Sequence, residues 1–464
     1  MFRTLGEKIA VSTEAQAAKR RARRAAKKNM AAMKNTVARN YELVAQPARE
    51  VRPRLKATTV AGRRAVQLKI DVPLLLTVIT LVIYGLVMVY SASYDFSYFD
   101  EGNYTAVFLR QVLWVAVGIV GAVCLMFLDY HYWRQFAVPA MAVTILLLIG
   151  VLIVNETRLG AVRALFSGRG QPSELAKLMT IVYLAVWLDA KRDQIKDINF
   201  GLVPLAAILG LLGGLIVLQP DLSAVVTIFF LGGLLFFLAG GDLRQIGILL
   251  VLAVLIGYLI FVLYPTGSSR ISDYLAGLRD PTEASYHIRR SYEAFVKGGW
   301  FGVGIGKGET KLTGLPVPHT DSIFAVVGEE SGVLGSAAMI ALFTVFLWRG
   351  MVICRRAPDA LGALLAAGLT LWISIEAFIN MAVMVNLLPF AGNALPFISA
   401  GGSNLIVSLA AVGVLMNIAR QSEKKKEENG KFTAVVNLRR WNRRRSVSSP
   451  RRPARPARTS GERG

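Results

Sequence analysis

The sequence is poor in charge and nearly free of cysteine. Only 18% of its 464 residues are charged and 54% are hydrophobic, which excludes an ordinary soluble protein of this length. The two cysteines, Cys124 and Cys354, cannot form a disulfide framework. No apolar run occurs in the first seventy residues, so we expect no secretory signal peptide and expect the first apolar span to direct insertion.

The net positive charge of the chain comes from its two ends. Residues 1–70 hold 18 Lys/Arg against 4 Asp/Glu, and residues 420–464 hold 15 against 4. Basic tails beside apolar spans follow the positive-inside rule and contact anionic lipid, which we favour over nucleic-acid binding. We expect a partly disordered basic tail over 1–69, a membrane domain over 70–420 and a disordered basic tail over 421–464.

Apolar runs near the length of a bilayer crossing predict an all-α polytopic membrane protein. We expect ten spans, at about 71–92, 108–128, 135–154, 174–190, 201–219, 222–240, 243–264, 321–349, 360–386 and 396–419. An even number places both basic tails on one side, which the positive-inside rule makes cytoplasmic. The sequence therefore predicts a multi-pass protein of the cytoplasmic membrane with both termini inside the cell.

A long connection separates the seventh and eighth spans. Residues 265–320 form a loop of about 56 residues, far above the usual length, on the side opposite the tails. Its glycine string, GGWFGVGIGKGETK, fails as a phosphate-binding loop because Gly308 follows Lys307. Basic residues on this side suit an anionic phosphate or only loop solvation: Arg158, Arg163, Arg169, Arg270, Arg279, Arg289, Arg290, Lys297, Lys307 and Lys311.

Ionisable residues within membrane spans are expensive and usually functional. Glu174 and Lys177 lie three residues apart and share a helix face, so they could form a structural pair. Asp321 opens the eighth span, where it is either a helix N-cap or a reactive carboxylate. Three more acidic residues lie within the spans. Glu329 and Glu330 follow Asp321 in the eighth span, roughly 12–14 Å deeper at 1.5 Å per residue, and Glu376 lies in the ninth. Asp221 opens the sixth span and could likewise serve only as a helix N-cap.

Six segments, in order between residues 70 and 420, closely resemble the SEDS family, the FtsW, RodA and SpoVE proteins. They are YSAS (90–93), QPSELAKL (171–178), QPDL (219–222), GGWFGVGIGKG (298–308), LPVPHTDSIFAVVGEESGVLG (315–335) and LLPFAGNALPFISAGGSNL (387–405). YSAS, the HTD segment and the long basic N-terminal tail look more like FtsW than RodA.

The resemblance implies a peptidoglycan glycosyltransferase that polymerises lipid II on the outer face of the membrane during cell division. It implies a class B penicillin-binding protein and division-complex proteins as partners, the nascent glycan strand as product, and Asp321 as the catalytic base. It permits a divalent cation, Mg or Mn, without proving one, and no metal ligands are assigned. Candidate substrate contacts are Arg163, Lys177, Arg270, Lys311, His319, Glu174 and Ser399.

The chain departs from the family pattern at several matched positions. Glu376 stands where the family typically has Gln, His287 ends a segment usually reading Gly-Tyr-Gln, and Val162 and Ala164 flank Arg163 in place of the usual pattern. Ser322, Ser223 and Ala400 also differ. Three other functions remain open, namely a lipid II flippase, a RodA-like elongation polymerase and a non-catalytic division scaffold. A flippase would need a polar path across the spans, for which the buried acids are candidates.

Overall fold

The computed structural model describes residues 70–154, 171–263 and 265–445, and within these ranges the chain is all-helical. Arg163 lies outside the described residues, as does the basic tail over 1–69. The described α-helices are α2 (Val72–Glu101), α3 (Ala106–Phe127), α4 (Trp133–Val154), α5 (Pro172–Ala190), α6 (Val203–Val217), α7 (Leu222–Leu238), α8 (Leu243–Leu263), α9 (Pro265–Arg279), α10 (Tyr286–Gly298), α11 (Ile323–Arg356), α12 (Ala360–Met384) and α13 (Gly402–Arg445).

Each of the ten expected spans coincides with one of these helices, and the predicted fold class is confirmed. Within the described residues, seven apolar helices are long enough to cross a membrane, and α7 and α8 contain shorter apolar stretches. The remaining predicted span, α5, carries the charged residues Glu174, Lys177 and Asp189. The last helix, α13, continues to Arg445, past the expected end of its span at residue 419.

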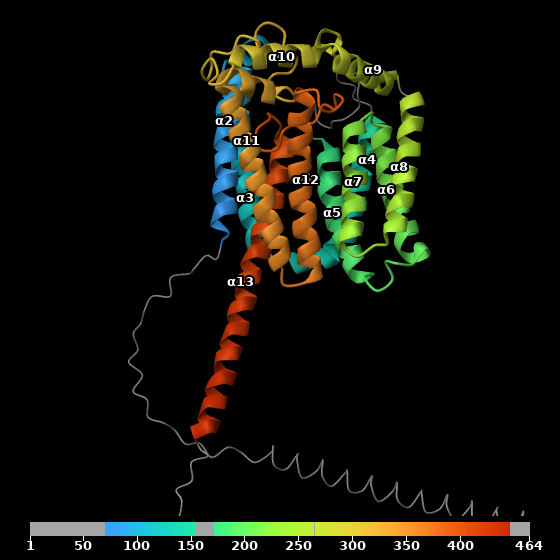
Figure 1. Ribbon diagram of the computed structural model, residues 1–464, viewed down its shortest axis with the longest axis vertical. Coiled ribbons are helices and arrows are strands. Elements are labelled where there is room, and N and C mark those ends of the chain that lie inside the picture. The colour runs from blue at the N-terminus through green and yellow to red at the C-terminus, as the bar shows by residue number, and fades with distance from the viewer. Residues whose placement is uncertain (1–69, 155–170, 264, 446–464) are drawn as a thin grey trace, which may run out of the picture. The chain divides into compact units, whose positions relative to one another are not determined.

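The segment between the seventh and eighth spans differs from the loop that we expected. It folds into α9, the short turn Pro281–Glu283 and α10 before the glycine-rich stretch begins. Figure 1 shows α9 and α10 lying across one end of the helix bundle, which we call the α9–α10 end. One face of α10 buries Ile288, Ser291, Ala294 and Gly298, and this helical spacing explains why a segment with polar residues still packs as a helix.

The eighth span is broken near its beginning. Gly332 has φ 67° and ψ −167°, which interrupts α11. Glu329 and Glu330 both precede the break. The 24 residues from 333 to 356 are enough to cross a bilayer core of about 30 Å.

Replacing Gly332 with Ala should strongly destabilise the protein. A Cβ atom here would lie 2.5 Å from the Gly302 nitrogen and 2.6 Å from the Trp300 carbonyl carbon. A positive φ with ψ near 180° is essentially restricted to glycine and costs roughly 1–3 kcal/mol for an L residue. We expect a lower thermal midpoint in detergent than for Gly247→Ala, a matched change in α8 with nothing within 4 Å. Equal midpoints for the two variants would contradict this account.

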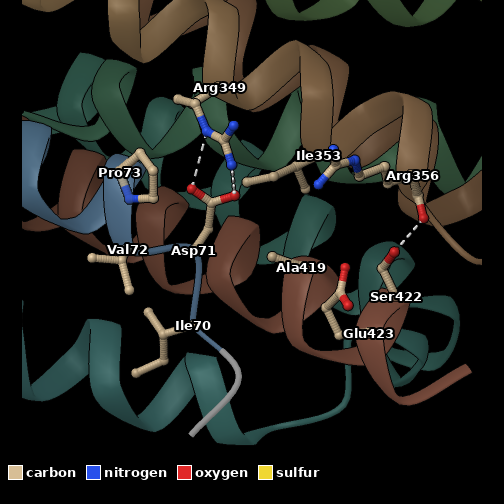
Figure 2. A pocket seen from close by; sticks show the side chains of 10 residues that line it. All are labelled: Ile70, Asp71, Val72, Pro73, Arg349, Ile353, Arg356, Ala419, Ser422 and Glu423. Carbon is tan, nitrogen blue, oxygen red and sulfur yellow. Dashed lines mark hydrogen bonds and ion pairs between the residues drawn. The ribbon is translucent and has the colours of Figure 1, made fainter. Parts of the chain in front are cut away.

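The opposite end of α11 borders a cavity of about 370 Å³ that is lined by both apolar and charged side chains. Figure 2 shows the Arg349 guanidinium facing the Asp71 carboxylate there, with Nε–Oδ1 and Nη2–Oδ2 distances of 3.2 and 2.5 Å. Asp71 also accepts a hydrogen bond from the Leu74 N–H and caps α2. This ion pair joins the first and eighth spans, and the cavity lies far along α11 from Asp321.

Candidate functional site

Asp321 lies in a turn in which three successive backbone carbonyl groups each accept a hydrogen bond from another segment. The Ala400 N–H donates to the His319 carbonyl at 2.8 Å. The Ser399 hydroxyl donates to the Thr320 carbonyl at 2.7 Å, and the buried Asn380 amide donates to the Asp321 carbonyl at 2.9 Å. The backbone that carries the carboxylate is therefore fixed, which is what a preorganised reactive group requires.

The helix that follows does not use Asp321 as its cap. Ser322 occupies the N-cap position of α11, without a side-chain capping bond, and the helix begins at Ile323. The capping interpretation of Asp321 is therefore wrong. Asp221, in contrast, does cap α7, because its carboxylate accepts a hydrogen bond from the Ala224 N–H at 3.4 Å.

The Asp321 carboxylate lies close to the backbone of Gly392. Gly392 has a φ of +60°, and a Cβ atom there would lie 3.4 Å from Asp321 Oδ2 and 3.9 Å from the Phe390 ring. The Arg270 guanidinium lies over the same ring at 5.6 Å, and the His287 ring stacks on it with centroids 4.3 Å apart. Phe390 thus brings a cation from α9 and an imidazole from α10 to the neighbourhood of Asp321.

Both histidines at this end are held in a setting that favours the neutral imidazole. Burial lowers the pKa of His319 to about 4, against an upward effect of Asp100. Burial and then the nearby Arg270 lower the pKa of His287. Both side chains therefore lie beside the turn without adding positive charge at neutral pH.

Stability should fall as the pH drops from about 6.5 to about 4, through His319. The unfolded chain takes up the proton near the ordinary pKa of 6.5, whereas the folded chain resists it until about 4. One pH unit between the two values corresponds to about 1.4 kcal/mol, so the loss can reach about 3 kcal/mol. Thermal midpoints measured against pH should fall less steeply for His319→Gln, and parallel curves would contradict this prediction.

A second group of predicted residues forms a buried ion network in the membrane spans. Lys177 Nζ donates to Glu174 at 2.8 Å and also to Glu376 of α12, which confirms the predicted Glu174–Lys177 pair. The Asn404 amide of α13 donates to the other Glu174 oxygen at 3.0 Å. All four residues are less than a tenth exposed, so they form a closed cluster that joins α5, α12 and α13.

This network is one helical turn from the Asp321 turn. Glu376 and Asn380 lie four residues apart, on one face of α12. Glu376 bonds Lys177, whereas Asn380 donates to the carbonyl groups of Asp321 and Asn393. The same helix thus ties the ion network to the turn that carries Asp321.

The two Gln-Pro motifs meet beside this network. Gln171 and Ser173 donate to one Asp221 carboxylate oxygen at 3.2 and 3.0 Å, and the Ser403 hydroxyl accepts from the Gln171 N–H at 3.2 Å. The start of α5 is therefore locked to the start of α7 and to α13. These residues position the helix that carries Glu174 and Lys177.

Lys311 belongs to a third group, which anchors the glycine-rich segment. Lys311 Nζ donates to Glu330 and to the Ser91 hydroxyl, both at 2.7 Å. Glu330 also accepts from the Gly306 N–H at 2.9 Å, while Glu329 accepts from the N–H groups of Glu309 and Thr310. The two glutamates therefore fasten residues 299–312 to the bundle.

The candidates therefore separate into three places. Asp321, His319, Ser399 and, through Phe390, Arg270 lie together at the α9–α10 end. Glu174 and Lys177 lie in the ion network, and Lys311 holds the glycine-rich segment. Within the described ranges, no three His, Cys, Asp or Glu side chains come together as ligands for a metal ion, so a divalent cation stays an expectation.

Sequence reasoning missed four residues that complete the site. Asn380, Phe390 and Gly392 hold or line the Asp321 turn, and Gln111 hydrogen-bonds Ser399 and Gly401 in the segment that supports it. Phe390 and Gly392 stand in a segment that the family resemblance did mark, but nothing local assigned them a role. Gln111 and Asn380 were each visible as a lone amide in an apolar span, which is a signal for an interhelical hydrogen bond.

The fold and this arrangement define a polytopic helical membrane protein with a carboxylate on a fixed turn at one end of the bundle. Residues 72–424 match the FtsW/RodA/SpoVE family of cell cycle proteins, and the chain belongs to that family.

Two relatives align with this chain over nearly all of their own length. The chain is 40% identical over 358 residues to a probable peptidoglycan glycosyltransferase FtsW of Trichlorobacter lovleyi, covering 75% of this chain and 93% of that protein. It is 38% identical over 359 residues to stage V sporulation protein E of Bacillus subtilis, covering 75% and 97%.

Two solved structures share the fold. One, from work on the structural coordination of polymerization and crosslinking by a peptidoglycan synthase complex, has a TM-score of 0.64 at 26% identity, covering 76% of this chain and 98% of that one. The rod shape determining protein RodA of Thermus thermophilus has a TM-score of 0.57 at 25% identity, covering 76% and 97%.

Proposed function

We propose that this protein is an inverting peptidoglycan glycosyltransferase of the FtsW type, with Asp321 as its general base. The observation that carries the proposal is the Asp321 carboxylate, which caps no helix and stands on a turn whose carbonyl groups are held by Ala400, Ser399 and Asn380. The names of its relatives support the same chemistry. The substrate is lipid II, a disaccharide on undecaprenyl pyrophosphate.

In the proposed reaction the 4-hydroxyl oxygen of the acceptor sugar attacks C1 of the donor sugar. A new C1–O bond forms, the bond from C1 to the pyrophosphate oxygen breaks, and the configuration at C1 inverts. Asp321 takes the hydroxyl proton as the bond forms, and the pyrophosphate leaves with the bonding electrons. We propose Arg270 as the cation that stabilises that leaving charge, with Lys177 and Arg163 as further proposed contacts.

The α9–α10 end would face away from the cytoplasm, with both basic tails inside. That orientation follows from the charge of the tails and short loops, and it places Asp321 where lipid-linked donors are used. We propose a class B penicillin-binding protein as the partner that crosslinks the strands, and a role in cell division within a larger complex. The amphipathic α10 and the exposed ring of Trp300 offer surface at this end for such contacts.

A flippase is less well supported by the buried charges. Lys177 bonds both Glu174 and Glu376, and Glu174 also accepts from Asn404, so these charges are paired within one buried cluster, although the second Glu376 oxygen has no hydrogen-bond partner among the described residues. A transport path would need polar groups that continue across the bundle, whereas Glu329 and Glu330 are occupied by the glycine-rich segment. The cluster is better explained as a support for the helices around the site.

The test is polymerisation of fluorescent lipid II by the full chain, reconstituted in vesicles with its class B partner. We expect glycan strands that lengthen with time and are digested by lysozyme. Vesicles without the partner should be assayed in parallel for movement of lipid II between leaflets. Transport without polymer under any partner condition would overturn the proposal in favour of the flippase.

A further inference from the structure

The end of α2 presents an aromatic ring to the Asp321 turn. Phe96 is 45% exposed, yet one part of its surface packs on the His319 ring, with centroids 4.5 Å apart and planes inclined by 34°. His319 is itself 8% exposed and stands two residues before Asp321. Two residues of chain span at most about 7 Å. The Phe96 ring therefore packs on the same turn that carries the proposed base.

A carboxylate accompanies the ring on the same face of α2. Asp100 follows Phe96 by four residues in a continuous helix, which places both on one side. Asp100 is exposed, and its position one helical turn after Phe96 puts it on the side of α2 that carries that ring. An exposed aromatic ring and an exposed acceptor therefore share the side of α2 where the ring packs on His319.

The neighbouring tyrosines of α2 have a different setting. Tyr94 and Tyr98 stack on Tyr104 with centroids 4.5 and 4.3 Å apart. Tyr90 and Tyr94 continue the face of α2 that is exposed along the span, as at Val87, which is typical of an aromatic belt at a membrane surface. Phe96 instead points to the turn, so the belt does not explain it.

We infer that Phe96 and Asp100 form a carbohydrate subsite that holds a sugar of the glycan strand beside Asp321. This deepens the proposed function and rests on it. A pyranose ring has one face of C–H groups and a rim of hydroxyls. The C–H face packs on the electron-rich face of an aromatic ring, and the hydroxyls donate to a carboxylate as charge-assisted hydrogen bonds. Exposed apolar surface beside a reactive group commonly marks a ligand site.

The subsite is tested by Phe96→Leu, which keeps apolar cover over His319 but removes the flat ring. We expect the KM for lipid II to rise about three- to tenfold, the range of one aromatic contact, with shorter strands and a nearly unchanged kcat. Phe96→Tyr keeps the flat ring, so its KM should equal that of the wild type. Asp100→Asn should raise KM in the same direction. Phe99→Ala is the matched control, because Phe99 is 86% exposed and its ring neighbour is Tyr98.

Direct binding separates this inference from the polymerase assignment. Saturation-transfer NMR of the full chain in nanodiscs with chitotetraose should give sugar signals for the wild type and for Phe99→Ala, and weak signals for Phe96→Leu. Equal signals in all three would overturn the subsite even if the protein polymerises lipid II. Weaker binding of the partner by Phe96→Leu, with an unchanged KM, would assign the ring to a protein interface instead. Loss of polymerisation by the wild type would overturn only the proposed reaction.

Discussion

Asp321→Asn should abolish polymerisation while the protein folds and binds its partner normally. The substitution keeps the size of the side chain and removes the proton acceptor, and general-base catalysis typically contributes 10²–10⁴-fold. The hydrogen bonds that fix the turn go to the backbone carbonyl groups of residues 319–321, so Asn can occupy the same turn. The measurement is the initial rate of strand formation from lipid II at saturating partner.

Asp280→Asn is the matched control for this experiment. Asp280 lies on the turn between α9 and α10, at the same end of the bundle, where its carboxylate accepts from the Thr282 N–H at 2.8 Å. Asn is an equally good acceptor at such a position, so we expect wild-type rates. A full rate for Asp321→Asn would refute the base role. Equal losses for both variants would indicate a general effect of charge at this end.

The helices of the membrane domain could be predicted because apolar runs near twenty residues have few alternatives. The charge of α5 did not hide it, since Glu174 and Lys177 share a face and neutralise each other. The long connection over residues 265–320 was predicted from its length, but its helices were not, because α10 buries only one face. The break at Gly332 was not predictable, since its cause is the close approach of Trp300 and Gly302 from another segment.

The site was predictable only where the family resemblance reached it. Asp321 and His319 stood in one matched segment and Ser399 in another, and the structure brings these segments together. Lys311 could not be assigned, because a basic residue in a loop gives no sign of whether it meets substrate or, as here, Glu330. Asn380 reaches Asp321 across 59 residues of chain, a contact that only the packing of α12 against the turn reveals.

Lys177→Met should strongly destabilise the membrane domain. It leaves Glu174 and Glu376 buried without their cation, and breaking a buried ion pair from one side typically costs about 3–5 kcal/mol.

The double variant Lys177→Met with Glu376→Gln should recover part of that loss, because one of the two carboxylates becomes a neutral amide that can still hydrogen-bond. Thermal midpoints in detergent measure both effects, with Lys191→Met at the exposed end of α5 as the control. A midpoint for Lys177→Met equal to that of Lys191→Met would mean that the network contributes little to stability. Recovery of the midpoint without recovery of polymerisation would show that Lys177 acts on the substrate as well as on the fold, which is the distinction between its two proposed roles.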